Sequence, residues 1–275
     1  MNIYVENKIS PGRYLVLIPL TIVMIGPLIW MLRVAFAPTG ASLDFPELWL
    51  SEFTFSNFYD SLTSGQLSRA LFNSAFVGAA VTIGNVLFCF LSGYALARKR
   101  FPGGKLIFIS MLMILMVPTH VLIIPLFLLL TKVGMFDTYW ALILPFLVSP
   151  IGVFMVRQYF GGIPVSLEEA ARIDGAGEIR ILFTVLAPLC KPILAVLAIQ
   201  TFLTNWNSFL YPFILTSSEK LQTLPVTLAL MQGYQAIDWQ RLMAGSTLSV
   251  IPVLIIFILF QRQIVSGITA GAVKQ

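Results

Sequence analysis

The chain has 275 residues, of which 58% are hydrophobic and only 11% are charged; its mean hydropathy is +0.90 and its formal net charge is +5. Soluble domains carry about a quarter charged residues, so this composition excludes an ordinary soluble domain. At about 20 apolar residues for each membrane-crossing helix, the length accommodates six spans. We therefore predict an all-α, polytopic membrane protein with six transmembrane helices.

The first charge-free run covers residues 14–32 and follows a basic segment. A basic start, an apolar run and the small residues near position 35 also fit a cleaved signal peptide. Arg33 interrupts the exit from the run, however, and Pro38 follows the would-be cleavage site. We therefore predict an uncleaved first span, preceded by a cytoplasmic N-terminus at residues 1–13.

The second predicted span lies within residues 70–97, after a polar loop that contains several aromatic residues. Small residues recur in it at four-residue spacing, Ala80 with Gly84 and Gly93 with Ala97. This spacing favours close packing between helices in lipid.

The third predicted span lies within residues 106–131 and contains Pro118 and Pro125, so we expect it to be kinked or broken. The only histidine, His120, lies beside the first of these prolines. An ionisable group inside a span is a candidate functional residue by default, and we name His120 as a candidate for the substrate path. The alternative is a neutral histidine bonded between helices. No Asp or Glu lies within this span, so neither a metal cluster nor a proton relay is predicted.

The fourth span is predicted within residues 138–156, whereas the fifth is predicted to cover residues 192–218 and the sixth residues 242–261. Residues 221–237 also lack charge, but their glutamines and Pro225 make them a poor span. We expect them to form an outer-surface or re-entrant element.

The predicted fifth span is unusually polar, and so many polar groups cannot all face lipid. Neutral amide, hydroxyl and aromatic groups are what a path for a sugar or polyol would offer, whereas packing between helices is the alternative for any single one. Gln200 and Thr204 belong to this polar set. The candidate path residues within it are Asn205, Asn207, Ser208 and Tyr211.

Residues 166–188 form one charged island between the fourth and fifth predicted spans. Ser166 and the glutamate three residues later have the form of a capping box, which predicts the start of a helix. Glu168 precedes Arg172 by four residues, a favourable spacing for an ion pair on one helix face. Gly175 is expected to end the helix. A short helix with small side chains, held between two spans, is suited to docking on another protein.

The orientation of the spans follows from the positions of lysine and arginine. With the N-terminus inside, all 17 of these residues lie in inner segments except Arg33, Arg69, Lys132, Lys220 and Arg241. The positive charge therefore indicates topology and no nucleic-acid partner. In this orientation the charged island faces the cytoplasm.

Residues that would carry chemistry are few. Gly103 to Leu106 is not a P-loop, because the earlier glycine and the Ser or Thr after the lysine are both missing. No catalytic residue and no metal ligand is predicted, and no cofactor is expected in this chain. Cys89 and Cys190 fall in different apolar stretches, which favours two buried small residues over a disulfide.

Three motifs resemble one known family. Glu169-Ala170-Ala171, three residues, Gly175, nine residues and then the stretch ending at Pro188 resemble the EAA loop of ABC importer permeases, with Val185 and Ala187 in place of Ile and Leu. Residues 206–212, WNSFLYP, resemble the WNDFLWP run of carbohydrate-importer permeases, with Ser208 in place of the usual Asp. Residues 267–274 resemble the tail of the smaller permease of maltose-type importers.

The resemblance implies a permease subunit of the bacterial plasma (inner) membrane, with residues 14–262 as its transmembrane domain and 263–275 as a cytoplasmic tail. It implies a second homologous permease, two ATP-binding subunits that hold ATP and Mg, and an extracytoplasmic substrate-binding protein. A coupling loop at residues 157–183 would carry a coupling helix that docks on an ATPase. The coupling residues carried over are Glu168, Glu169, Ala170, Ala171, Asp174 and Gly175.

The substrate implied by the resemblance is a carbohydrate, polyol or glycoside, and a glycerol phosphate or another small solute is the alternative. An ion-coupled secondary transporter is a different class of membrane protein. It would require buried carboxylates, and none lies within the predicted spans. An intramembrane enzyme would want a catalytic constellation, and no such set of residues stands in the sequence.

Overall fold

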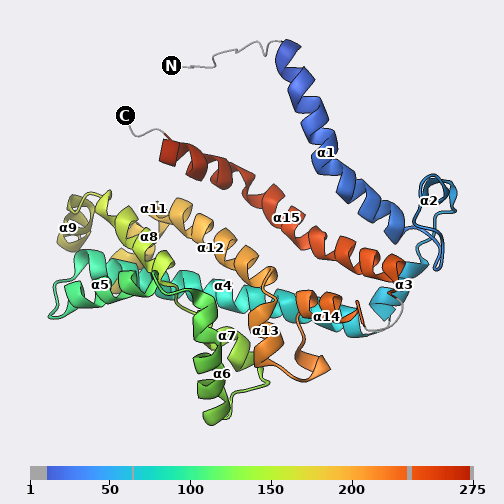
Figure 1. Cartoon of the computed structure of the whole chain (residues 1–275). Coiled ribbons are helices and arrows are strands. Elements are labelled where there is room, and N and C mark those ends of the chain that lie inside the picture. Colours follow the sequence, from blue (N-terminus) through green and yellow to red (C-terminus); the bar gives the residue numbers. More distant parts are fainter. Residues whose placement is uncertain (1–10, 64, 234–236, 273–275) are drawn as a thin grey trace. The chain divides into compact units, whose positions relative to one another are not determined.

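The computed structural model describes residues 11–63, 65–233 and 237–272, and all regular structure in these ranges is helical (Figure 1). The predicted all-α class is therefore confirmed. The longest helices are α1 (Pro11–Ala35), α4 (Gln66–Arg98), α12 (Lys191–Trp206) and α15 (Trp239–Ala272).

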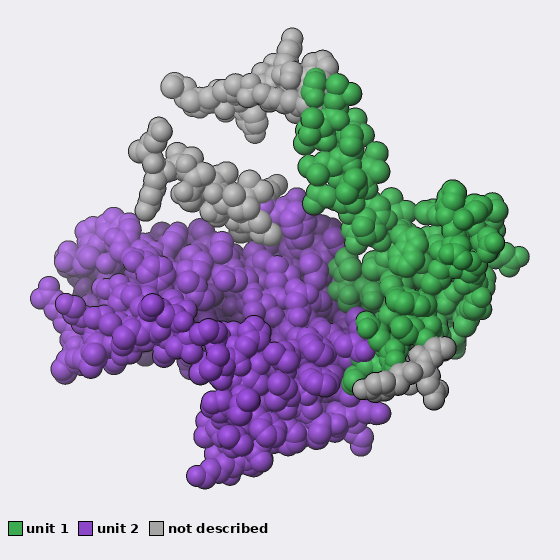
Figure 2. Space-filling model, in the orientation of Figure 1, with its two compact units in different colours: residues 1–65, 230–250 green, residues 66–229, 251–275 purple. Residues whose placement is uncertain are grey.

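The chain divides into two compact units, which Figure 2 shows in different colours. Unit 1 comprises residues 1–65 and 230–250, and unit 2 comprises residues 66–229 and 251–275. Unit 1 holds α1, the short helices α2 (Glu47–Leu50) and α3 (Ser56–Thr63), and the first turns of α15.

A buried amide holds unit 1 together. The Asn57 side chain donates to the carbonyl oxygens of Ala35 at 2.9 Å and Ala37 at 2.7 Å, which ties α3 to the end of α1. Val34, Ala37 and Leu48 form the small apolar core beside this contact. The polar loop after the first helix is thus anchored by both hydrogen bonds and burial.

Helix α4 is the centre of unit 2, where it packs against α8 (Pro150–Gly161) and α12 (Figure 1). Two of its glycines make close packing with other helices possible. A Cβ atom at Gly84 would lie 2.3 Å from Leu147 Cδ2, and one at Gly93 would lie 2.6 Å from Val156 Cγ1. The close packing expected from the small-residue spacing is therefore confirmed at both glycines.

Four of the described helices are long and apolar enough to cross a membrane, and the number rises to six when each of two bent helix pairs counts as one span. The four are Tyr14–Ala35, Gln66–Arg98, Tyr139–Gly161 and Trp239–Gln261. They coincide with the first, second, fourth and sixth predicted spans. The fourth consists of α7 (Tyr139–Ile143), η2 (Leu144–Phe146) and α8.

The third predicted span is broken, as its prolines indicated. Helix α5 (Gly104–Ile114) ends with four residues between it and Thr119, and η1 (Thr119–Leu122) with α6 (Ile123–Lys132) continues at an angle of 101°. Pro118 lies at the break in an extended backbone conformation. A proline lacks the amide hydrogen that would continue the helix.

The fifth predicted span is shorter than expected. Helix α12 stops at Trp206, and α13 (Leu210–Leu215) starts again after Asn207. The prediction of one span to residue 218 is therefore wrong. At the stop, the side-chain amides of Asn205 and Asn207 donate to the carbonyl oxygens of Thr201 and Leu203, a local bonding pattern that competes with helix continuation.

On its other side, α12 forms the second bent pair with the segment made of α10 (Glu178–Arg180), η3 (Ile181–Leu186, a π-helix) and α11 (Ala187–Leu189), at 78°. The helix η4 (Glu219–Leu221) ends at the first residue of the segment 221–237, and α14 (Leu224–Leu230) within the segment is too short to span. This agrees with the prediction of a poor span.

Candidate functional site

A cavity of about 450 Å³ lies in unit 2 between α4, α8, α12 and the break of the third span. Every residue that lines it is uncharged. The polar lining residues are Asn85, Thr119, Ser149, Gln200, Thr201, Thr204, Asn205, Ser208 and Tyr211. The apolar remainder of the wall includes Leu115, Phe146 and Leu197.

The Asn85 amide organises the wall of this cavity. Its nitrogen donates to the Phe146 carbonyl at 3.0 Å, and its oxygen accepts from the hydroxyls of Ser149 and Thr201, each at 3.3 Å. These bonds join α4 to η2, to the start of α8 and to α12. Asn85 was not predicted from the sequence, although an amide in the middle of an apolar span is the signal that would have found it.

Three of the five candidate path residues line the cavity, and two do not. Asn205, Ser208 and Tyr211 lie in its wall, and the Tyr211 hydroxyl donates to the Thr119 carbonyl at 2.7 Å. Asn207 is exposed and outside the lining, with its amide bonded to the Leu203 carbonyl. His120 is also exposed and outside the lining.

The charged island forms α9 (Ser166–Ile173), but its start differs from the prediction. The N-cap is Val165, whose carbonyl accepts from the amides of Glu168 and Glu169, and no side chain caps the helix. The predicted capping box at Ser166 is therefore wrong. The turn at Pro164 starts the helix one residue early, so Ser166 already belongs to its first turn.

Glu168 and Arg98 form a nearly buried ion pair instead. The Arg98 Nε lies 2.7 Å from Glu168 Oε1, and the two side chains are 12% and 2% exposed. Arg98 also donates to the carbonyl of Ile163. Because Arg98 ends α4, the pair fastens the start of α9 to the end of the central helix.

A wider network continues from this pair. Arg172 lies 3.5 Å from Glu168, the expected pair along one helix face, and 3.2 Å from Glu178. Glu178 also binds Lys99 at 2.6 Å and accepts from the Tyr94 hydroxyl at 2.8 Å. The hydrogen bond to Glu178 raises the pKa of Lys99, because it stabilises the charged form of the lysine.

Gly175 ends α9, as predicted. Its φ is +82°, its amide donates to the Arg172 carbonyl, and the Ala176 amide donates to the Ala171 carbonyl. This is a Schellman motif, in which a left-handed glycine satisfies the last carbonyls of a helix. The network at one end and the glycine at the other define a short, fixed helix.

The six carried-over coupling residues divide into two groups. Glu168 and Ala171 are buried and hold α9 against the rest of unit 2, whereas Glu169, Ala170, Asp174 and Gly175 are exposed. Large apolar side chains share the exposed surface, with Ile173 87% exposed and Leu167 42% exposed. Arg98 was not predicted as a partner of α9, although its place in the basic segment at the end of a span made it a candidate for an ion pair.

The tail motif covers residues 267–274, of which residues 273 and 274 lie outside the described residues. Helix α15 continues through Ala272, and residues 273–275 are not described.

Membrane-length helices around an uncharged cavity, with a charged helix fixed at the end of the central span, define an integral membrane transport subunit. Residues 86–270 match the family of binding-protein-dependent transport system inner membrane components. The chain belongs to this family and is a multi-pass protein of the inner membrane.

Curated relatives cover most of the chain. The arabinooligosaccharides transport system permease protein AraQ of Halalkalibacterium halodurans is 38% identical over 90% of each chain. The trehalose/maltose transport system permease protein MalG of Thermococcus litoralis is 36% identical over 93% of each. The sn-glycerol-3-phosphate transport system permease protein UgpE of Brucella abortus is 35% identical over 74% of this chain and 72% of its own.

A solved structure shares the fold. It is that of a bacterial ABC transporter involved in the import of the acidic polysaccharide alginate, with a TM-score of 0.80 at 22% identity. The match covers 91% of this chain and 94% of the solved chain. The all-α permease fold extends over nearly the whole sequence.

Proposed function

We propose that this chain is the smaller type of permease subunit in an ABC importer that carries a neutral carbohydrate, polyol or glycoside into the cytoplasm. The observation that carries the proposal is the cavity of about 450 Å³, whose polar groups are all neutral amides and hydroxyls. Such groups donate to and accept from sugar hydroxyls without the cost of burying an unpaired charge. The relatives named for arabinooligosaccharides and trehalose/maltose support the same substrate class.

A glycerol phosphate is the second candidate substrate, because one relative carries that name. A phosphate ester would require cationic partners along its path. The lining of this cavity has none, so we favour the neutral solute.

The importer is completed by a second homologous permease, two ATP-binding subunits and an extracytoplasmic binding protein. The exposed face of α9 would dock on one ATP-binding subunit, through Glu169, Ala170 and Asp174 together with Ile173. ATP and Mg would be held by that subunit and not by this chain. The orientation that follows has both termini in the cytoplasm, with a tail at residues 263–275.

The ion pair between Arg98 and Glu168 suggests how the docked helix acts on the cavity. Closure of the ATP-binding subunits would move α9, and this pair would carry the displacement to α4. Helix α4 carries Asn85 in the cavity wall. Alternating access would then follow from the movement of α4 and α12 around the cavity.

A pair of neighbouring substitutions tests the path. Ser208→Leu would fill part of the cavity and remove a hydroxyl. We expect uptake to fall about tenfold or more, because the solute loses one hydrogen bond and part of the space it occupies. Asn207→Leu places the same leucine at the neighbouring position, outside the lining, and is expected to leave uptake within about twofold. Uptake of labelled oligosaccharides by proteoliposomes of the complete importer provides the measurement. Equal effects of the two variants would contradict the assignment of the cavity as the path.

A further inference from the structure

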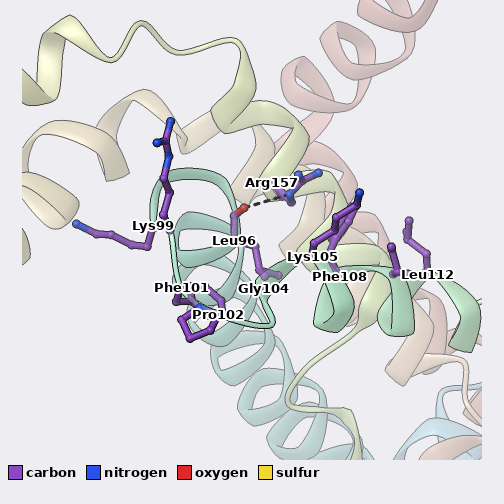
Figure 3. A pocket seen from close by; sticks show the side chains of 11 residues that line it. Leu96, Lys99, Phe101, Pro102, Gly104, Lys105, Phe108, Leu112 and Arg157 are labelled. Carbon is purple, nitrogen blue, oxygen red and sulfur yellow. Dashed lines mark hydrogen bonds between the residues drawn. The ribbon is translucent and has the colours of Figure 1, made fainter.

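A second, larger pocket of about 850 Å³ lies where the end of α4, the turn at residues 99–103 and the start of α5 meet α8 (Figure 3). It is separate from the transport cavity, since the two share no lining residue. Its lining combines basic and apolar side chains and includes no acid. The lining residues are Leu96, Lys99, Arg100, Phe101, Pro102, Gly104, Lys105, Phe108, Ile109, Leu112 and Arg157.

Three of the four cations at this pocket lack a carboxylate partner. Lys99 is paired with Glu178. In the described part of the chain, no carboxylate lies within 4 Å of Arg100, Lys105 or Arg157. An uncompensated cluster of three cations creates a site of positive potential that favours a bound anion.

Arg157 is held in place without being neutralised. Its Nε donates to the Leu96 carbonyl at 3.3 Å, and its guanidinium lies 3.9 Å from the centroid of the Phe108 ring (Figure 3). These contacts orient the guanidinium and leave its charge available. Its position in the wall is thus fixed before any ligand arrives.

The other half of the pocket is apolar and continues along α5. This helix has no buried residue, and Leu106 is 67%, Ile109 41% and Met113 54% exposed. A ligand with a charged group at the pocket and hydrocarbon along α5 would match both halves. The pocket also lies at the end of a membrane-length helix, the depth at which lipid headgroups are found.

We propose that this pocket binds the phosphate headgroup of an anionic phospholipid, whose acyl chains lie along α5. Basic pockets between transmembrane helices are suited to anionic headgroups. A soluble anion would leave the apolar wall uncovered, and a zwitterionic lipid would bring its own cation toward the three already present. In the orientation proposed above, the bound lipid belongs to the inner leaflet.

Lipid retention by the purified full-length protein, together with the subunits that accompany it, tests the proposal. The protein is equilibrated in micelles with equal amounts of phosphatidylglycerol and phosphatidylcholine, and retained lipids are counted by native mass spectrometry. The wild type should retain phosphatidylglycerol preferentially. Each cation near an anionic surface contributes about a fivefold change in affinity, so Lys105→Gln with Arg157→Gln should lower this retention about twenty-five-fold.

A second double variant, Arg100→Gln with Lys105→Gln, leaves the contacts of Arg157 intact and should show the same loss. The matched control is Arg180→Gln with Lys191→Gln, which removes two exposed cations outside the pocket and should retain the lipid normally. Unchanged retention in both pocket variants would overturn the proposal. So would equal retention of the two lipids, or displacement of the lipid by excess inorganic phosphate. None of these readouts depends on transport.

Discussion

Glu168 and Glu169 are adjacent in the sequence, yet their environments are opposite. The Glu168 residue is 1% exposed and ion-paired with Arg98, whereas Glu169 is exposed. Removing one partner of a buried ion pair costs about 3–5 kcal/mol, because the remaining charge stays desolvated. Substituting Glu168 would therefore report on the folding of α9. Of the two glutamates, only Glu169 reports on the exposed face of the helix.

Asp137 offers a residue-scale prediction about pH. Its φ is +56°, and its carboxylate accepts from the amides of Ser217 at 2.9 Å and Ser218 at 3.0 Å, which ties the α6–α7 turn to the end of α13. Burial alone would raise the pKa of Asp137, but these hydrogen bonds outweigh it and lower the pKa. A depressed folded pKa means that the stabilisation is present above the unfolded value of about 3.9 and is lost as pH falls through the folded pKa.

Asp137→Asn should therefore destabilise the protein at neutral pH by about 1 kcal/mol, at the low end for charged hydrogen bonds because the side chain is half-exposed. Asparagine tolerates the left-handed conformation, so the backbone is not the cause. The difference in thermal midpoint from the wild type should shrink below about pH 4. Glu219→Gln, a nearby exposed acid with no side-chain bond in the described residues, serves as control. A pH-independent difference would contradict the prediction.

At the scale of elements, the contact between α4 and α8 depends on Gly93. A Cβ there would lie 2.6 Å from Val156 Cγ1 and 3.1 Å from the backbone nitrogen of Arg157, and the backbone cannot move aside locally. The nearest neighbour of a Cβ at Gly84 is instead the flexible end of Leu147. The two positions in α4 should thus respond differently to the same added methyl group.

We expect Gly93→Ala to destabilise the protein by about 1–3 kcal/mol, as overpacking does, and Gly84→Ala to cost less. Gly161→Ala is the control, since a Cβ there meets nothing within 4 Å. Thermal unfolding of the three variants in one detergent gives the ranking. A Gly93→Ala variant as stable as Gly161→Ala would show that the helices separate easily.

Proline and charge spacing predicted the elements well, because both act locally. Pro118 broke the third span as expected, and charge-free runs located the membrane-length helices. The end of α12 was missed, because its asparagines could equally have faced a neighbouring helix instead of bonding to their own backbone. For the same reason the sequence placed Asn207 and Ser208 together in the path, whereas the structure separates them. Both residues follow the end of α12 at Trp206, where side chains no longer keep the helical spacing.

At the scale of the whole molecule, we expect the exposed face of α9 to dock on the ATP-binding subunit. Glu169→Arg reverses a charge on that face without touching the buried pair of Glu168. If Glu169 is desolvated against a basic group, the reversal should cost about 2–5 kcal/mol of binding, whereas a solvated glutamate would cost about 0–1 kcal/mol. We therefore expect the variant to insert normally but to bind and stimulate less ATPase.

The measurement is the amount of ATP-binding subunit that co-purifies with the tagged permease, together with substrate-stimulated hydrolysis. Glu52→Arg, an equal charge reversal at an exposed acid in the predicted outer loop, is the control. Normal co-purification and transport with Glu169→Arg would refute the docking of α9.

The early stop of α12 has an electrostatic consequence for the whole transport path. The helix ends at Trp206 beside the cavity, and Thr204 and Asn205 from its last turn lie in the wall. The carbonyl end of a helix carries a partial negative charge, equivalent to roughly half an elementary charge. The start of α8, which carries the opposite partial charge, lies in the same wall at Ser149, Pro150 and Ile151. A solute in the cavity would therefore lie between two opposite helix ends, whose field would orient its hydroxyl dipoles at a place where no lining side chain is ionised.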